Sequence, residues 1–241
     1  MKRRVCSLVL ALAMVLGMLG VNPAALAAGE DEPATWDLFE ADTINYASGW
    51  NCSVGTKIGA ENVTQQSGYV NLLKDQNKTI TSSDGGAYIW LVPKTAPVLP
   101  GSSQFTVEVT ARVHSAVAGE ANEISVRMGT GSNDTNGKLY PLFLTYGTEG
   151  TISTQANGND AKLLDTTVWH NYGLVVDPQT KTYSVYVDGD VFFSAVAAVT
   201  YKGGNLLRMG TDNNARCDLD VLAGRVGTGD LSAQLGEYPL P

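Results

Sequence analysis

The chain has 241 residues, of which 44% are hydrophobic and 17% are charged, and its formal net charge at pH 7 is −8. An acidic chain does not attract a phosphate backbone, so we expect no nucleic acid among its partners. The same charge disfavours strongly anionic polysaccharides unless a local basic patch offsets it.

The N-terminus shows the three regions of a secretory signal peptide. Lys2-Arg3-Arg4 is basic, residues 5–21 form an apolar run, and Ala25-Leu26-Ala27 supplies small residues for cleavage. A transmembrane anchor is the alternative, but the run is near the lower length limit for a membrane span. We therefore expect residues 1–28 to be removed, residues 29–35 to form a mobile leader, and no membrane span to remain. The mature protein is expected to be secreted or at the cell surface.

From Trp36 onward, apolar and polar residues alternate with a period of two, and no sustained helical stripe is present. The clearest case is residues 104–114, whose apolar side chains share one face and whose polar side chains share the other. The polar face consists of Thr106, Glu108, Thr110, Arg112 and His114. Further strands are predicted at residues 123–128, 139–146, 151–155, 169–176, 182–187, 191–195, 206–210 and 217–226. Turn residues separate them, so we expect one all-β domain, a two-sheet antiparallel sandwich over residues 36–241.

Residues 169–193 predict three consecutive antiparallel strands. Residues 177–181 join the first two strands, and Asp188-Gly189 joins the second to the third. An Asp-Gly pair between alternating apolar runs favours a type I′ turn, in which both central residues have positive φ.

The same segment resembles the W-H-x-Y-x-L-V-x-D … Y-x-V-Y-V-D-G signature of concanavalin A-like lectin/glucanase domains, the laminin-G-like jelly rolls. Residues 36–55 are similar to the opening strand of that family, and residues 205–227 to its final hairpin. The resemblance implies a jelly-roll sandwich of the secreted bacterial type whose first and last strands are neighbours. It also implies binding of poly- or oligosaccharide.

Catalysis is the less favoured interpretation of this resemblance. Glucan-cleaving members carry Glu-x-Asp-x-x-Glu on a central strand, and the nearest string here, Glu40-Ala41-Asp42, lacks the second glutamate. His114 shares a strand face with Arg112, and Arg127 is expected on a neighbouring strand. These three residues could act in proton transfer, so a lyase or hydrolase activity is retained as an alternative. We therefore predict a non-catalytic carbohydrate-binding domain, with a glycan-active enzyme or a surface protein-interaction module as alternatives.

Sugar recognition needs an aromatic plane beside polar groups. Tyr140 and Tyr186 are candidates for the plane, whereas Trp169 is interpreted as a packing residue and His170 as a hydrogen-bonded structural histidine. The predicted ligand site therefore consists of Arg112, His114, Arg127, Tyr140 and Tyr186.

Calcium is common in the resembled family, held between the first and last strands, and Asp42 and Asp220 match that pattern here. A purely structural role for these acids is the alternative.

Cys52 and Cys217 form a disulfide in one interpretation and remain buried thiols in the other. We expect a monomer.

Overall fold

The computed structural model describes residues 36–40, 50–54, 63–66, 68–72, 89–93, 103–116, 124–130, 138–155, 158–200, 206–211 and 217–241. Trp36–Pro241 form one compact unit. The predicted signal peptide and leader lie outside the described residues. Among the described residues, no helix is long and apolar enough to cross a membrane.

The described regular structure consists of strands and one short 3₁₀ helix. The strands are β1 (Trp36–Glu40), β2 (Trp50–Val54), β3 (Val63–Gln65), β4 (Val70–Leu72), β5 (Ile89–Pro93), β6 (Phe105–Ala116), β7 (Ile124–Thr130), β8 (Lys138–Leu139), β9 (Leu142–Leu144), β10 (Gly150–Ser153), β11 (Lys162–Leu164), β12 (His170–Asp177), β13 (Thr182–Val187), β14 (Asp190–Ala197), β15 (Val199–Thr200), β16 (Leu206–Thr211) and β17 (Cys217–Thr228), and the helix is η3 (Ser232–Gln234).

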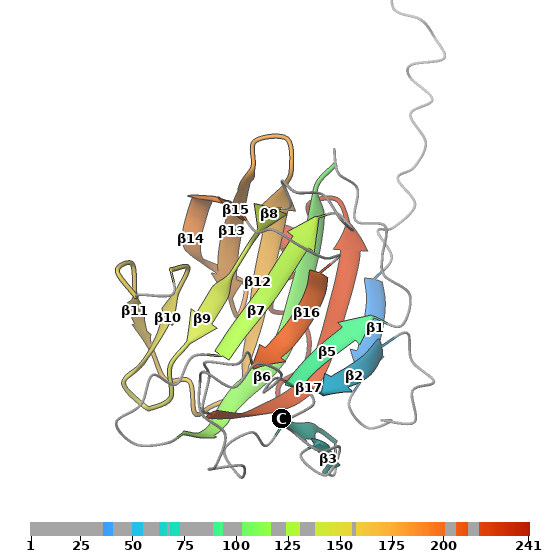
Figure 1. Cartoon of the computed structure of the whole chain (residues 1–241), viewed down its shortest axis with the longest axis vertical. Coiled ribbons are helices and arrows are strands. Elements are labelled where there is room, and N and C mark those ends of the chain that lie inside the picture. The colour runs from blue at the N-terminus through green and yellow to red at the C-terminus, as the bar shows by residue number, and fades with distance from the viewer. Residues whose placement is uncertain are drawn as a thin grey trace, which may run out of the picture. The chain divides into compact units, whose positions relative to one another are not determined.

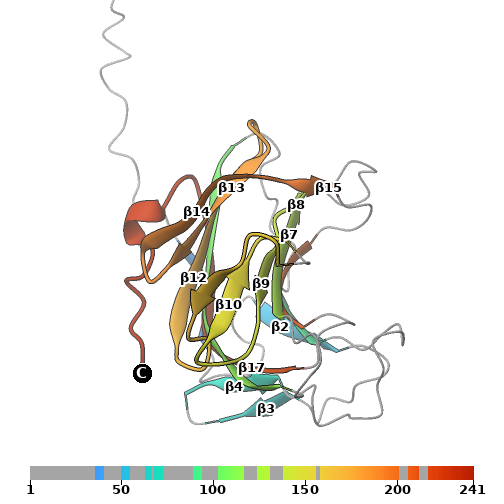
Figure 2. The same ribbon diagram turned by 90° about the vertical axis from the view of Figure 1, so that its left-hand side faces the viewer.

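The strands form two antiparallel sheets that face each other (Figures 1 and 2). In the eight-stranded sheet the order is β14-β13-β12-β6-β17-β4-β3, and β1 also pairs with β17. In the nine-stranded sheet the order is β11-β10-β9-β7-β16-β5-β2, with β8 and β15 beside it. The predicted all-β antiparallel sandwich is confirmed.

The core lies between the sheets and follows the predicted alternation. Val107, Val109, Ala111 and Val113 of β6 are at most 2% exposed and face the core. The predicted hairpins are also confirmed, because β12 pairs with β13 and β13 with β14. Asp188 and Gly189 have φ values of 52° and 89°, as a type I′ turn requires.

Two features differ from the predicted strands. The strand expected over residues 139–146 is divided into β8 and β9, since Pro141 has no N–H to donate to a sheet. The short hairpin of β3 and β4 was not predicted, and it extends the eight-stranded sheet beyond β17.

The first and last described strands are neighbours, as the resemblance implied, with Trp36 opposite Gly227 and Glu40 opposite Ala223. Cys52 belongs to β2 in one sheet and Cys217 to β17 in the other. Their side chains lie outside the described part of the molecule, so the disulfide stays a prediction.

Residues 229–241, here called the C-terminal segment, follow β17 and include η3. They lie against the outer face of the eight-stranded sheet, the face turned away from the core (Figure 2). Leu231 and Leu235 of this segment are 6% and 5% exposed.

Candidate functional site

The outward polar face of β6 is divided into a covered half and an exposed half. Thr106, Glu108 and Thr110 are at most 1% exposed. The side chains of Arg112 and His114 are 30% and 45% exposed. The sequence predicted one polar face but not this division, which comes from the C-terminal segment.

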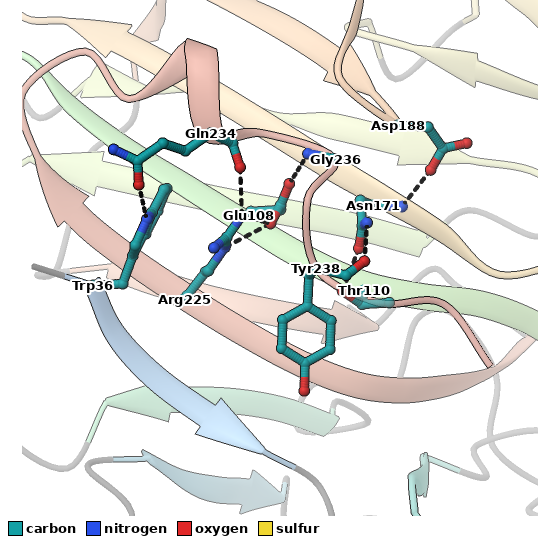
Figure 3. A network of polar contacts seen from close by, with 9 residues as sticks. All are labelled: Trp36, Glu108, Thr110, Asn171, Asp188, Arg225, Gln234, Gly236 and Tyr238. Atoms are coloured by element: carbon teal, nitrogen blue, oxygen red, sulfur yellow. Dashed lines mark hydrogen bonds and ion pairs between the residues drawn. The ribbon is translucent and has the colours of Figure 1, made fainter.

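The covered half is held by an ion pair between neighbouring strands (Figure 3). Nε and a terminal nitrogen of Arg225 both lie 2.6 Å from Oε2 of Glu108. The other carboxylate oxygen accepts a 2.7 Å hydrogen bond from the Gly236 N–H. Burial raises the pKa of Glu108, and the Gly236 N–H and Arg225 oppose that rise. Glu108 therefore binds the C-terminal segment and is not available to a ligand.

Other contacts fix the same segment to the sheet (Figure 3). Asn171 donates from Nδ2 to the Tyr238 carbonyl at 2.8 Å, and Arg225 donates to the Gln234 carbonyl at 2.7 Å. Nε1 of Trp36 donates to Oε1 of Gln234 at 2.8 Å. The covered half thus has a structural role.

The exposed half is organised around Asp220. This carboxylate is 0% exposed, and its Oδ2 accepts a 2.8 Å hydrogen bond from Nε of Arg112. Nδ1 of His114 lies 3.3 Å from the same oxygen. Its Oδ1 accepts a hydrogen bond from Nδ2 of the buried Asn71.

Two aromatic rings bound the Arg112 guanidinium. Its central carbon lies 4.9 Å from the ring centroid of Trp169 and 5.7 Å from that of Tyr69. The two rings meet edge to face, with centroids 5.5 Å apart and an interplanar angle of 73°. Such cation–π contacts limit the positions that a guanidinium can take. We call Tyr69, Arg112, His114, Trp169 and Asp220 the outer-face site.

Strand register creates this arrangement from distant parts of the chain. Asn71 on β4 lies opposite Asp220 on β17, and Asp220 lies opposite Arg112 on β6. Outward residues at matching register positions form a row across the sheet. Register shifts at residues 218–219 and 221–223 flank Asp220, so the row lies in a locally irregular part of β17.

The structure brings together only part of the predicted site. Arg112, His114 and Asp220 meet, whereas Arg127 lies on β7 in the opposite sheet, opposite Arg208 of β16. The prediction that Arg127 neighbours Arg112 is wrong, because the chain passes from one sheet to the other between β6 and β7.

The two predicted tyrosines are not in the outer-face site. Tyr140 is 0% exposed and packs edge to face against Phe105 and Tyr183, so its ring is part of the core. Tyr186 is half-buried and faces outward from β13, as its phase predicted, at a position opposite Gly173.

Of the two predicted calcium ligands, Asp42 lies outside the described residues. Asp220 presents its oxygens to the Arg112 guanidinium and the Asn71 amide, which are donors that compete with a cation. No cluster of three or more potential metal ligands occurs in the described parts of the chain. The described half of the set does not fit calcium, and calcium at this position stays a prediction.

Sequence reasoning missed Tyr69 and Asn71, and interpreted Trp169 as packing. The turn before β4 carried a usable signal, since Ser67-Gly68 is a turn dipeptide. Gly68 has a φ of 87°, and Gln66 N donates to the Tyr69 carbonyl at 2.8 Å to close the turn. That turn places Tyr69 beside Trp169.

The structural role predicted for His170 is confirmed. Its Nδ1 lies 2.7 Å from Oδ2 of Asp188, and its Nε2 lies 2.8 Å from the Asp165 carbonyl oxygen. Burial would lower the pKa of His170, but these contacts together raise it above its ordinary value. His170 fastens the 188–189 turn to the start of β12 and takes no part in the outer-face site.

No family model and no curated protein matches this sequence. Among solved structures, the carbohydrate esterase vb_24B_21 from the Shiga toxin-encoding bacteriophage phi24B is similar, with a TM-score of 0.53 at 13% identity; the match covers 82% of this chain and 100% of that one. The carbohydrate recognition domain of Emp47p gives a TM-score of 0.46 at 16% identity, over 84% of this chain and 100% of that one. Trypanosoma rangeli sialidase gives 0.45 at 15% identity, over 76% of this chain and only 28% of that one. The likeness to the esterase shows that the chain shares a known β-sandwich fold.

Proposed function

We propose that the protein is a secreted, non-catalytic domain that binds poly- or oligosaccharide at the outer-face site. The observation that carries the proposal is a half-buried aromatic corner, made by Tyr69 and Trp169, with the Arg112 guanidinium held beside it. An aromatic surface next to polar hydrogen-bonding groups is the combination that a sugar ring requires.

The geometry also reduces the entropic cost of binding. Arg112 is fixed by Asp220 at one edge and by two rings beside it, so its side chain is ordered before any ligand arrives. Immobilising a flexible side chain costs about 0.5–1.5 kcal/mol on association. Because Arg112 is already ordered by Asp220 when the protein folds, this entropic cost does not reduce the free energy of ligand binding.

The N-terminal signal-like segment supports export, and an exported protein meets extracellular glycans. The proposal agrees in substrate class with the carbohydrate esterase named above, although that likeness concerns the fold alone.

A glycan-active enzyme is the second candidate, favoured by one observation. The exposed His114 has Nδ1 3.3 Å from the buried Asp220, an arrangement in which a carboxylate can orient a histidine for proton transfer. Under this alternative, incubation with a polysaccharide releases reducing or unsaturated ends, and His114→Ala abolishes the release.

The test is affinity electrophoresis of the purified full-length protein in gels that contain neutral or acidic polysaccharides, with calcium or with EDTA. We expect retardation by at least one polysaccharide, and at least about tenfold weaker binding for Trp169→Ala, the usual scale for loss of an aromatic contact residue. Tyr146→Ala is the matched control, since Tyr146 is 46% exposed and lies between β9 and β10 of the opposite sheet.

Three results bear on the alternatives. Absence of retardation in every gel overturns the proposal and favours a protein-interaction module. Retardation that persists in Trp169→Ala places the binding site elsewhere. Loss of retardation in EDTA shows that binding needs a divalent cation.

A further inference from the structure

In the outer-face site the carboxylate of Asp220 is buried, and the guanidinium of Arg112 is partly exposed. Asp220 is 0% exposed, and both of its oxygens already accept hydrogen bonds. Arg112 is 30% exposed and can only donate. A ligand that faces Arg112 must therefore supply acceptors, and a carboxylate supplies nothing else at neutral pH.

We infer that the sugar bound at this site carries a carboxylate group, and that Arg112 recognises it. The inference rests on the proposed function and names the class of ligand. A uronic acid or another acidic sugar has this chemistry.

The orientation of the guanidinium supports a two-point contact. Arg112 donates to Asp220 through Nε, so the end formed by its two terminal nitrogens points away from Asp220. Within the part of the chain that the structure describes, Asp220 is the carboxylate paired with Arg112. Two terminal N–H groups of one planar guanidinium match the two oxygens of a carboxylate.

The neighbouring side chains complete the recognition. His114 lies against the same carboxylate oxygen as Arg112 and is 45% exposed, so it adds a second polar contact beside the guanidinium. Trp169 and Tyr69 are half-buried, and the ring surface that Arg112 does not cover provides apolar contact for the C–H groups of the sugar ring. Together Arg112 and His114 provide short-range polar contacts through which an acidic chain can bind an acidic glycan.

Burial of Asp220 has a consequence for the salt dependence. The Asp220 charge compensates Arg112, and the whole chain carries a formal charge of −8, so long-range attraction of a polyanion is absent. Binding then depends on short-range hydrogen bonds, and added salt screens the repulsion between protein and ligand. We expect the affinity for an acidic glycan to stay constant or rise between low and physiological salt, unlike that of a basic polyanion-binding protein.

The test compares glycans that differ only in the carboxylate. Full-length protein is run by affinity electrophoresis and calorimetry against polygalacturonate, alginate and hyaluronan, each beside its carboxyl-reduced form, and against dextran and dextran sulfate. For at least one pair we expect the acidic form to bind at least about tenfold more tightly, as for loss of a hydrogen bond to a charged group. Arg112→Lys keeps the charge but loses the planar pair of donors, so Arg112→Lys and Arg112→Gln are both expected to abolish the preference. Lys181→Gln, an exposed charge change in the 177–181 turn, should leave it unchanged.

The outcomes separate this inference from the proposed function. Equal binding of an acidic glycan and its reduced form, or binding of neutral glycans alone, overturns the carboxylate assignment and leaves carbohydrate binding intact. Tighter binding of dextran sulfate than of every carboxylate polymer also overturns it, in favour of a sulfate ligand. A preference that persists in folded Arg112→Lys shows that another residue recognises the acid. Absence of binding to all of these polymers contradicts the proposed function itself.

Discussion

The side chain of Leu235 packs directly on the backbone of Gly173, in the space that a side chain at position 173 would fill. A Cβ on Gly173 would lie 2.7 Å from Cδ1 and 2.8 Å from Cδ2 of Leu235. Gly173 belongs to β12, 62 positions before Leu235 in the chain, so this contact adds apolar packing to the hydrogen bonds that hold the C-terminal segment on the sheet. A glycine at position 173 therefore allows Leu235 to approach β12 closely.

Shortening Leu235 should loosen the C-terminal segment. Leu235→Ala removes a side chain that is 5% exposed, and we expect the free energy of unfolding to fall by about 2–3 kcal/mol. Leu240→Ala is the matched control, because Leu240 is 42% exposed and should change stability by less than about 0.5 kcal/mol. Urea denaturation followed by tryptophan fluorescence measures both, and equal small effects would contradict the packing described here.

The reciprocal change should show coupling between the two positions. Gly173→Ala forces its new methyl group against Leu235, at an expected cost of about 1–3 kcal/mol. In the double variant Gly173→Ala/Leu235→Ala, the new methyl group enters space that the shortened side chain has vacated. The loss of stability measured for the double variant should therefore be smaller than the sum of the losses in the two single variants. Strictly additive losses would mean that the two residues do not touch.

Neutralising Glu108 should be strongly destabilising. Glu108→Gln leaves the Arg225 guanidinium, whose side chain is 12% exposed, without its charge partner. Breaking such a pair by removing one member costs about 3–5 kcal/mol. We therefore expect Glu108→Gln to lower the free energy of unfolding by about this amount in thermal and urea unfolding, and a loss below about 1 kcal/mol would contradict the role of the pair. Glu149→Gln, at an exposed position, is the control.

Stability should depend on pH through His170. Both of its ring nitrogens face acceptors, Asp188 and the Asp165 carbonyl, so both contacts are satisfied only by the protonated ring. Since the pKa of His170 is raised above 6.5 in the folded state, its stabilisation is complete below pH 6.5 and is lost as the pH rises through the folded-state pKa. Burial raises the pKa of Asp188, but the hydrogen bonds from His170 and Asn171 lower it by more, so the pKa of Asp188 lies below its ordinary value. Its contribution is therefore lost only in acid, as the pH falls through its folded-state value.

We expect the free energy of unfolding to decrease as the pH rises above 6.5 and through the folded-state pKa, with a slope that His170→Gln removes. His170→Gln should also cost about 1.5–3 kcal/mol at pH 6, the scale of hydrogen bonds to a charged group. His114→Gln retains His170 and should keep the slope. A slope that survives in His170→Gln would assign the pH dependence to another group.

Two buried tyrosines should respond in opposite ways to loss of the hydroxyl. Among the described residues, the hydroxyl of Tyr172 has no hydrogen-bond partner, whereas that of Tyr183 donates to the Pro141 carbonyl at 2.7 Å. Tyr172→Phe should therefore be neutral or stabilise the protein by up to about 1 kcal/mol, and Tyr183→Phe should destabilise it by about 1 kcal/mol. Paired thermal unfolding curves test this, and a loss in Tyr172→Phe would reveal a partner for its hydroxyl.

Local pattern predicted the features that depend on local chemistry. Alternation identified the buried face of β6, and the Asp188-Gly189 pair identified the turn between β13 and β14. Both signals depend only on a few adjacent residues. Alternation says which face a residue occupies but not which sheet its strand joins, so Arg127 was assigned to the wrong neighbour. The strands β3 and β4, with three residues each, are too short for a period to appear, and Tyr69 was missed with them. Burial of Glu108 depends on Gly236, which no local pattern can connect to it.

The docking of the C-terminal segment has a consequence for how the chain is made. Gly236 follows Glu108 by 128 positions, and synthesis proceeds at roughly 5–20 residues per second. For several seconds the nascent chain therefore carries β6 with its carboxylate still hydrated and its outer face uncovered. Contacts this distant in sequence also form slowly after release. Glu108 therefore reaches its buried, paired state only after Gly236 has left the ribosome.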